Sequence, residues 1–234
     1  MKINTFEVFG WTATSISIIL YFTPMIEYIK LCKGQIRYND TPNLKVLFNY
    51  ITCINWLIYA YLLKNKHILI CYLSGSVLSF ICVITFLLFL AKIKLLKSFL
   101  FTFILLAYTL MCYLLFALLI KNFDVLGYIC VFFSLLLLVY PFIILKKAIK
   151  YRNYKYIPIK LCLLSLVGTA CWIIYGFMII NFHVIIPNFI GMVFTLIIMF
   201  IWNIFKKRKP IAEEVANYSM NGSRSKPEQA VTIT

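Results

Sequence analysis

Long apolar stretches separated by short polar breaks recur along the whole chain. Seven of them are long enough to cross a hydrocarbon core of about 30 Å, so we interpret them as membrane-spanning helices. The expected ranges are 9–29, 44–63, 67–91, 99–120, 125–145, 159–180 and 184–205. The pattern predicts an all-α membrane protein with seven transmembrane helices.

The chain also repeats itself. Gly10, Ser17, Leu20 and Pro24 recur 117 residues later as Gly127, Ser134, Leu137 and Pro141. Pro42, Trp56, Tyr59 and Gly75 recur 116 residues later as Pro158, Trp172, Tyr175 and Gly191. Matched Pro, Gly and Trp positions are hard to obtain by chance in helices dominated by Leu, Ile and Phe, so we infer an internal duplication.

Each repeat covers three expected helices and leaves the fourth as a connector. An odd connector gives both repeats the same orientation, which predicts a parallel 3+1+3 arrangement. The expected divisions are 1–91 for the first repeat, 92–124 for the connector helix with its loops, 125–205 for the second repeat, and 206–234 for a polar, disordered cytosolic tail. Such duplications are typical of transporters that hold a substrate between the halves at mid-membrane.

Two side chains next to the polar break at 181–183 are candidates for a binding site. Counting from that break at about 1.5 Å per residue places Trp172 roughly 12 Å and Asn188 roughly 10 Å into neighbouring helices. Their equivalents in the first repeat, Trp56 and Tyr72, fall at about the same depth. Indole stacks on the C–H face of a sugar ring and an amide both donates and accepts, so the four residues form a candidate pocket for a polar molecule. The alternative is that they only pack and bridge helices.

Four prolines fall at related positions on the expected cytosolic side. Pro24 and Pro141 lie within helices, and Pro42 and Pro158 lie at helix starts. A proline inside a helix removes a backbone hydrogen bond and favours a kink. We interpret the four as hinges of an inner gate, with static shaping of the helices as the alternative.

Positive charge is distributed unevenly across the expected membrane. The net charge is +16, and 19 of the 23 Lys and Arg residues fall on one side when the amino terminus is placed outside. The outer side then receives Lys2, Lys64, Lys66 and Lys121. The positive-inside rule therefore places the carboxyl terminus in the cytosol, and the charge needs no nucleic-acid partner.

The sequence lacks the groupings expected of an enzyme, a metal site or an ion-coupled carrier. The eight cysteines form no Cys-x-x-Cys pair and are expected to be small buried hydrophobes. His67 and His183 are interpreted as interfacial polar residues. Glu27, the acidic residue nearest to the membrane interior, is interpreted as a partner of Lys30 at the membrane surface. We therefore expect no enzymatic activity, cofactor or metal, and a neutral substrate that moves down its own gradient.

Several motifs resemble those of the SWEET (MtN3/saliva) family of sugar transporters. They are Gly10, Thr23-Pro24-Met25, Trp56-Leu-Ile-Tyr59, Gly75, Tyr140-Pro141, Trp172-Ile-Ile-Tyr175-Gly176 and Pro187-Asn188-Phe-Ile-Gly191. The resemblance covers all seven expected helices. It implies bidirectional, facilitated diffusion (uniport) of a sugar across a lipid bilayer by alternating access, and members often form homo-oligomers.

The resemblance also implies roles for particular residues. Those of the central pocket are Trp56, Tyr72, Trp172 and Asn188, and those of the inner gate are Pro24, Pro42, Pro141 and Pro158. Size-filter positions fall on Leu20, Thr52, Leu137 and Gly168, and an outer-gate contact falls on Tyr59 and Asn181.

Two positions depart from the family pattern. Tyr72 stands where members usually have Asn, which narrows the pocket, and Asn181 stands where members often have Asp, which removes a charge-assisted hydrogen bond. The bulky Leu20 and Leu137 favour a monosaccharide such as glucose, whereas Gly168 favours a larger sugar.

The alternatives are a PQ-loop-like exporter of an amino acid or other small metabolite, and a heptahelical receptor. Met25 and Phe142 follow the prolines where a PQ-loop protein has Gln, and a receptor would show no such repeat. We expect a multi-pass protein of the plasma membrane, with an internal membrane as the alternative.

Overall fold

The structure is a computed structural model. It describes residues 5–34, 43–93, 96, 99–101, 103–104, 107–108, 111, 123–151, 154 and 157–206. Pro42, the predicted tail and most of the predicted connector helix lie outside the described residues.

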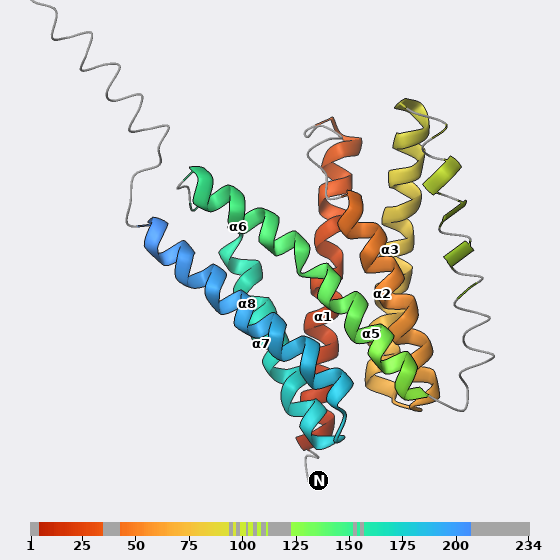
Figure 1. Cartoon of the computed structure of the whole chain (residues 1–234), viewed down its shortest axis with the longest axis vertical. Helices are drawn as coiled ribbons and strands as arrows, with labels where there is room; N and C mark the ends of the chain where they lie inside the picture. The colour runs from red at the N-terminus through yellow and green to blue at the C-terminus, as the bar shows by residue number, and fades with distance from the viewer. Residues whose placement is uncertain are drawn as a thin grey trace, which may run out of the picture.

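Within the described ranges the chain is helical (Figure 1). The helices are α1 (Thr5–Cys32), α2 (Asn43–Leu62), α3 (Lys66–Ile93), α5 (Phe123–Leu137), α6 (Val139–Tyr151), α7 (Ile159–Met178) and α8 (Phe182–Lys206). The stretches Thr5–Cys32, Lys66–Lys92, Asp124–Lys150, Ile159–Met178 and Phe182–Lys206 are long and apolar enough to cross a membrane. The limits of α1, α2, α3, α7 and α8 match the prediction to within a few residues, and α1, α3 and α8 are longer than expected.

One expected helix, 125–145, is broken into α5 and α6. Leu138 forms a turn between them, and its N–H bonds to the carbonyl of Leu135, a tighter connection than that of an α-helix. Pro141 follows three residues later, and its ring has no N–H to offer the carbonyl of Leu137. The break therefore lies where proline interrupts the hydrogen-bond ladder. Pro24 lies inside α1, which continues past it.

The two repeats pack against each other in a two-fold manner. Within the first repeat α2 and α1 both pack on α3, and within the second α7 and α5 both pack on α8. Between the repeats α1 packs on α7 and α2 packs on α5, which are equivalent contacts. The packing is that expected of a parallel duplication.

The molecule has two different ends. The turn end carries the α2–α3 and α7–α8 turns, at residues 63–65 and 179–181, and the lysine end carries Lys30, Lys92, Lys150 and Lys206. The two repeats converge at the turn end, next to the label N in Figure 1, and α6 and α8 lean away from α1 towards the lysine end.

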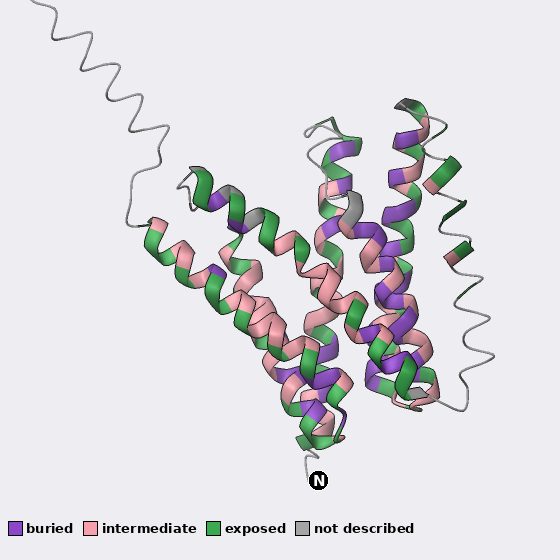
Figure 2. Ribbon diagram, in the orientation of Figure 1, coloured by how far each residue is buried: buried purple, intermediate pink, exposed green. Residues whose placement is uncertain are grey.

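The buried residues explain this shape (Figure 2). One core cluster joins both repeats, with Trp56, Tyr59, Trp172 and Tyr175 among its members, and it lies at the turn end. A second cluster, around Tyr28 and Phe86, belongs to the first repeat, and a third, around Leu145 and Ile198, belongs to the second. The described repeats therefore share a core only at the turn end, which leaves room between them at the lysine end.

Candidate functional site

A cavity of about 430 Å³ lies between the two repeats, on the lysine-end side of the shared core. Its walls come from α1, α2, α5, α6, α7 and α8. The lining residues are Leu20, Tyr21, Thr23, Pro24, Glu27, Lys45, Asn49, Leu137, Leu138, Tyr140, Pro141, Pro158, Leu161, Cys162, Ser165, Thr169, Pro187, Gly191, Phe194, Thr195 and Ile198. Its volume lies within the range of small-molecule sites, about 300–1,000 Å³.

Three of the predicted gate prolines line this cavity, namely Pro24, Pro141 and Pro158. Pro158 is the residue that precedes the first turn of α7, as expected for proline at a helix start. Pro141 lies beside the break between α5 and α6, Pro158 lies at the start of α7, and Pro24 lies inside α1, where its ring removes one backbone hydrogen bond.

The predicted size-filter residues separate into two pairs. Leu20 and Leu137 line the cavity from equivalent positions of the two repeats. Thr52 is buried and its hydroxyl donates to the carbonyl of Phe48, and Gly168 packs against Ile16 at the α1–α7 contact. Neither Thr52 nor Gly168 is among the described lining residues.

The two predicted pocket tryptophans lie just beyond the closed end of the cavity. Trp172 follows Thr169, a lining residue, by about one turn of α7. The indole N–H of Trp172 donates to Ser17 Oγ at 2.9 Å, and that of Trp56 donates to Ser134 Oγ at 2.9 Å. Each tryptophan therefore bonds the other repeat through a serine that the repeat also duplicates, and both rings are buried.

The remaining two pocket residues have different surroundings. Tyr72 stacks on Trp56, with ring centroids 5.2 Å apart and planes 7° apart. The amide of Asn188 donates to the carbonyl of Val184 within α8, and its neighbour Pro187 lines the cavity. None of the four predicted pocket residues is among the described residues that line the cavity.

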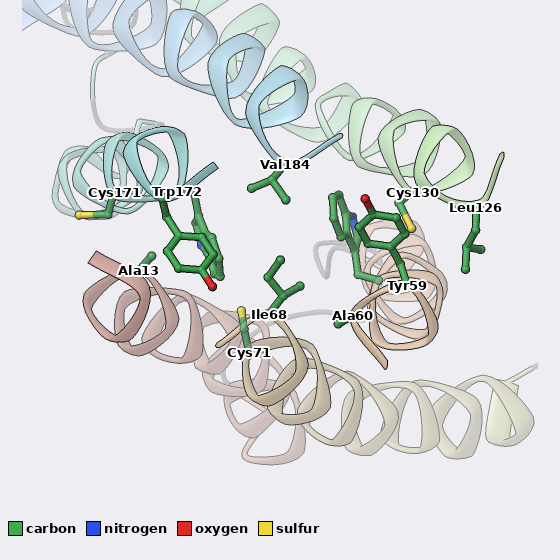
Figure 3. Packing of buried hydrophobic residues seen from close by; sticks show 12 residues of the cluster. Ala13, Tyr59, Ala60, Ile68, Cys71, Leu126, Cys130, Cys171, Trp172 and Val184 are labelled. Carbon is green, nitrogen blue, oxygen red and sulfur yellow. The ribbon is translucent and has the colours of Figure 1, made fainter. Parts of the chain in front are cut away.

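Hydrogen bonds join the two repeats to each other at the turn end. Asn181 Nδ2 donates to the Tyr59 hydroxyl at 2.7 Å, and the same hydroxyl lies 3.2 Å from His183 Nδ1. Figure 3 shows the surrounding core, in which the side chains of Ile68 and Val184 lie between those of Trp172 and Tyr59. The predicted Tyr59–Asn181 pair is therefore in direct contact.

A second, equivalent contact lies on the other side of the pseudo-two-fold axis. The Tyr175 hydroxyl donates to Asn65 Oδ1 at 2.9 Å and lies 3.0 Å from His67 Nδ1. Tyr175, Asn181 and His183 follow Tyr59, Asn65 and His67 by 116 residues each. Each tyrosine thus meets the Asn and His of the other repeat.

One of these two contacts carries extra charge. Glu7 lies 2.9 Å from Lys66 Nζ and 3.1 Å from His67 Nε2. Asp124, the acidic residue in the first turn of α5, lies three residues before Gly127, just as Glu7 precedes Gly10. The ion pairs between described residues join Glu7 to Lys66 and His67, and none of them involves Asp124. The two-fold relationship is therefore incomplete at this surface.

Sequence reasoning did not find the role of the histidines. His67 was expected at the membrane interface, but its side chain is 1% exposed and bonds Tyr175. The available signal was the 116-residue spacing, which pairs His67 with His183 and Asn65 with Asn181. The spacing alone does not predict these contacts, because each residue has its partner on the other repeat, far away in sequence.

The cavity wall is largely neutral. Apart from Glu27 and Lys45, the described lining residues are uncharged, and they offer hydroxyl groups, an amide and apolar surface. The described residues hold no group of three or more His, Cys, Asp or Glu side chains that would suit a metal ion. This chemistry suits a solute with several hydroxyl groups and no net charge.

The chain is similar to a family of known membrane proteins. A family model described as a sugar efflux transporter for intercellular exchange, MtN3_slv, matches residues 7–94 and 124–210. The chain belongs to the MtN3/saliva (SWEET) family of sugar efflux transporters. The two matched segments are the two repeats, and the family is one of transporters and not of enzymes, as predicted.

Individual relatives of this SWEET-family chain agree with the assignment. It is 28% identical over 217 residues to the bidirectional sugar transporter SWEET13 of Oryza sativa subsp. japonica, covering 88% of this chain and 71% of the relative. It is 27% identical over 208 residues to the bidirectional sugar transporter SWEET10 of Arabidopsis thaliana, covering 86% and 71%.

A solved structure of a eukaryotic SWEET transporter has the same fold. It superposes with a TM-score of 0.70 at 14% identity, over 88% of this chain and all of that one. The prediction of a multi-pass, all-helical membrane protein with seven helices in two repeats is therefore confirmed.

Proposed function

We propose that this protein is a bidirectional, facilitative uniporter of a small neutral sugar, a monosaccharide such as glucose, that works by alternating access. Membership of the sugar efflux family and the bidirectional sugar transport named for its relatives support this proposal. Leu20 and Leu137, which narrow the cavity from both repeats, support the smaller sugar.

The observation that carries the proposal is the contrast between the two ends. The cavity lies on the lysine-end side of the core, and a hydrogen-bonded layer of Tyr59, Asn181, Tyr175 and Asn65 joins the repeats at the turn end. A carrier of this kind alternates between two such arrangements around a fixed central site. The present arrangement is one of the two.

The charge distribution supports an orientation. Lysines cluster at the lysine end, and the positive-inside rule places such an end in the cytosol. The proposal therefore includes an amino terminus outside, a cavity that faces the cytosol, and a location in the plasma membrane. In this orientation the prolines of the cavity mouth, together with Pro42, act as the inner gate, and Tyr59 with Asn181 acts in the outer gate.

In this proposal Trp56, Tyr72, Trp172 and Asn188 hold the sugar midway between the gates. The two indoles would stack on its C–H faces once the substrate displaces their present packing, and the phenol and amide would bond its hydroxyl groups. The proposal is supported by Thr169 and Pro187, which line the cavity within about one helical turn of Trp172 and Asn188.

The test is counterflow of labelled D-glucose into liposomes that contain the purified full-length protein. We expect saturable exchange that needs no ion gradient and no ATP. Trp172→Ala and Asn188→Ala should abolish exchange while the protein stays folded, and Trp202→Ala, a tryptophan outside the cavity lining, should leave exchange intact.

Three results would contradict the proposal. The first is absence of exchange of glucose, fructose, galactose and sucrose by well-folded protein. The second is exchange that requires a proton or sodium gradient. The third is saturable exchange of an amino acid in place of sugars, which would favour the PQ-loop-like alternative.

A further inference from the structure

Two charged side chains share the wall of the cavity. Glu27 lies in α1, one turn past Pro24, and Lys45 lies near the start of α2. Both are half-buried, whereas Lys30, the expected partner of Glu27, is exposed. The ion pairs found between described residues do not include Glu27 with Lys30. Glu27 therefore lies in the cavity wall and does not form the expected pair at the membrane surface.

Lys45 is held in place by the second repeat. Its Nζ lies 4.4 Å from the centroid of the Tyr140 ring. An ammonium group over an aromatic face is attracted by the negative charge of that face. This contact keeps the Lys45 ammonium at the cavity wall and beside Pro141, where a passing solute would meet it.

Among the described lining residues, the charged side chains come from the first repeat alone. The residues equivalent to Glu27 and Lys45 in the second repeat are Ile144 and Leu161. Thr23 and Asn49 extend the polar wall along the first repeat, and Leu161 and Phe194 belong to the wall from the second. The second repeat adds apolar side chains and the hydroxyl groups of Ser165, Thr169 and Thr195 to the described lining, but no charge.

We infer that Glu27 and Lys45 form a second sugar-binding subsite at the lysine end, distinct from the central pocket. The Glu27 carboxylate accepts hydrogen bonds from two neighbouring hydroxyl groups of the sugar, and the Lys45 ammonium donates to a third oxygen. The C–H face of the ring lies against the wall formed by Leu161 and Phe194. This inference rests on the proposed function and deepens it.

Such a subsite acts on one side of the membrane only. It is reached from the lysine end in the present state and is cut off when the repeats close around it. Its loss therefore changes the apparent affinity at the cytosolic face and leaves the affinity at the outer face nearly unchanged. A residue that only supports the fold would not change the ratio of the two KM values.

The experiment compares zero-trans glucose influx with zero-trans efflux in cells that lack hexose carriers of their own. We expect Glu27→Gln and Lys45→Met each to raise the cytosolic KM by about tenfold, since each removes a charged hydrogen-bond partner. The outer KM should stay within about twofold. Lys30→Met, which removes an exposed charge at the same end, is the matched control and should change neither value.

Further variants separate binding from folding. Lys45→Arg keeps the cation and should restore most of the cytosolic affinity, and elution of the purified variants as monodisperse protein shows that they fold. An unchanged ratio of KM values in both Glu27→Gln and Lys45→Met, with wild-type glucose flux intact, overturns the subsite and leaves the proposed function standing. Absence of sugar flux in the wild type overturns both. Amino-acid exchange that Glu27→Gln and Lys45→Met abolish would assign the pair to a zwitterion and also overturn the sugar subsite.

Discussion

The amide of Asn181 donates a 2.7 Å hydrogen bond to the hydroxyl of Tyr59, which lies 122 residues earlier and in the other repeat. The side-chain oxygen of Asn181 also accepts from the N–H of Val184, in the first turn of α8. Asn181 thus caps a helix and joins the two repeats with one amide group. Because both partners are neutral, this closing bond is weaker than one that involves a carboxylate.

Asn181→Asp should strengthen the closed turn end. A carboxylate would accept a hydrogen bond from the Tyr59 hydroxyl, and bonds to charged groups contribute about 1.5–3 kcal/mol against about 1 kcal/mol for neutral ones. We expect the outward-open state to become rarer and the maximal rate of glucose exchange to fall several-fold. The distance between spin labels at the turn end, measured by pulsed electron paramagnetic resonance, would show the shift. In the Tyr59→Phe background the Asp variant should have no such effect, and a faster rate in Asn181→Asp alone would contradict this account.

Gly10 and Gly127 permit close packing at the turn end, of α1 on His67 and Tyr175 and of α5 on His183. A Cβ at Gly10 would lie 2.7 Å from His67 Cδ2 and 2.9 Å from the Tyr175 ring, and one at Gly127 would lie 2.5 Å from His183 Cδ2. Gly10→Ala and Gly127→Ala should each destabilise the structure by about 1–3 kcal/mol, the typical cost of overpacking. Thermal unfolding in detergent should show lower midpoints. Gly191→Ala is the matched control, since its Cβ would meet no atom nearer than 4.0 Å, and an equal loss there would argue against the steric explanation.

Ile180 occupies a strained position after α7. Its φ is 52°, and the N–H of Asn181 bonds the carbonyl of Gly176 in the manner of a helix C-terminal turn. A left-handed backbone costs a β-branched residue roughly 1–2 kcal/mol. Ile180 is also 81% exposed, so little packing is lost on substitution. Ile180→Gly should therefore raise the unfolding midpoint. Ile174→Gly, at an exposed position inside the helix, should lower it, and a lower midpoint for both would contradict the prediction.

Leu137 lines the cavity from the second repeat. Leu137→Ala should enlarge the cavity and raise the ratio of sucrose to glucose transport several-fold, because the side chain removed lines the proposed path of the sugar. Competition of unlabelled sucrose against labelled glucose measures this ratio. Leu163→Ala makes the same chemical change on an exposed surface, where it should leave the ratio unaltered. A similar ratio in both variants would remove Leu137 from the filter.

Tyr72 is stacked on Trp56, and the family resemblance implies Asn at this position. Tyr72→Asn should widen the central pocket and restore a second amide, so we expect additional sugars to be accepted. A panel of labelled mono- and disaccharides in the liposome assay would show the change. Tyr72→Phe keeps the ring stack and tests the hydroxyl separately, and an unaltered range in Tyr72→Asn would place residue 72 outside the pocket.

Much of the architecture could be predicted because it depends on local patterns. Apolar length gave the helix limits, and the Gly, Pro and Trp matches gave the duplication that the family comparison confirms. The break between α5 and α6 was not predicted, since Pro24 and Pro141 occupy equivalent positions and only the second lies beside a broken helix. The choice between a kink and a break depends on how neighbouring helices pack, and this information is not local.

The sequence by itself determined that this is a duplicated helical membrane protein with a lysine-rich end, and the family resemblance added Tyr59 and Asn181 as candidate partners. Hydrophobic length, proline chemistry and charge asymmetry are properties of the chain that need no neighbours. Only the tertiary structure decided that Trp56 and Trp172 bond serines of the opposite repeat, that His67 is buried against Tyr175, and that Glu27 and Lys45 share a cavity wall. Each of these facts joins residues from different helices, and their distance depends on how the two repeats converge at one end and separate at the other.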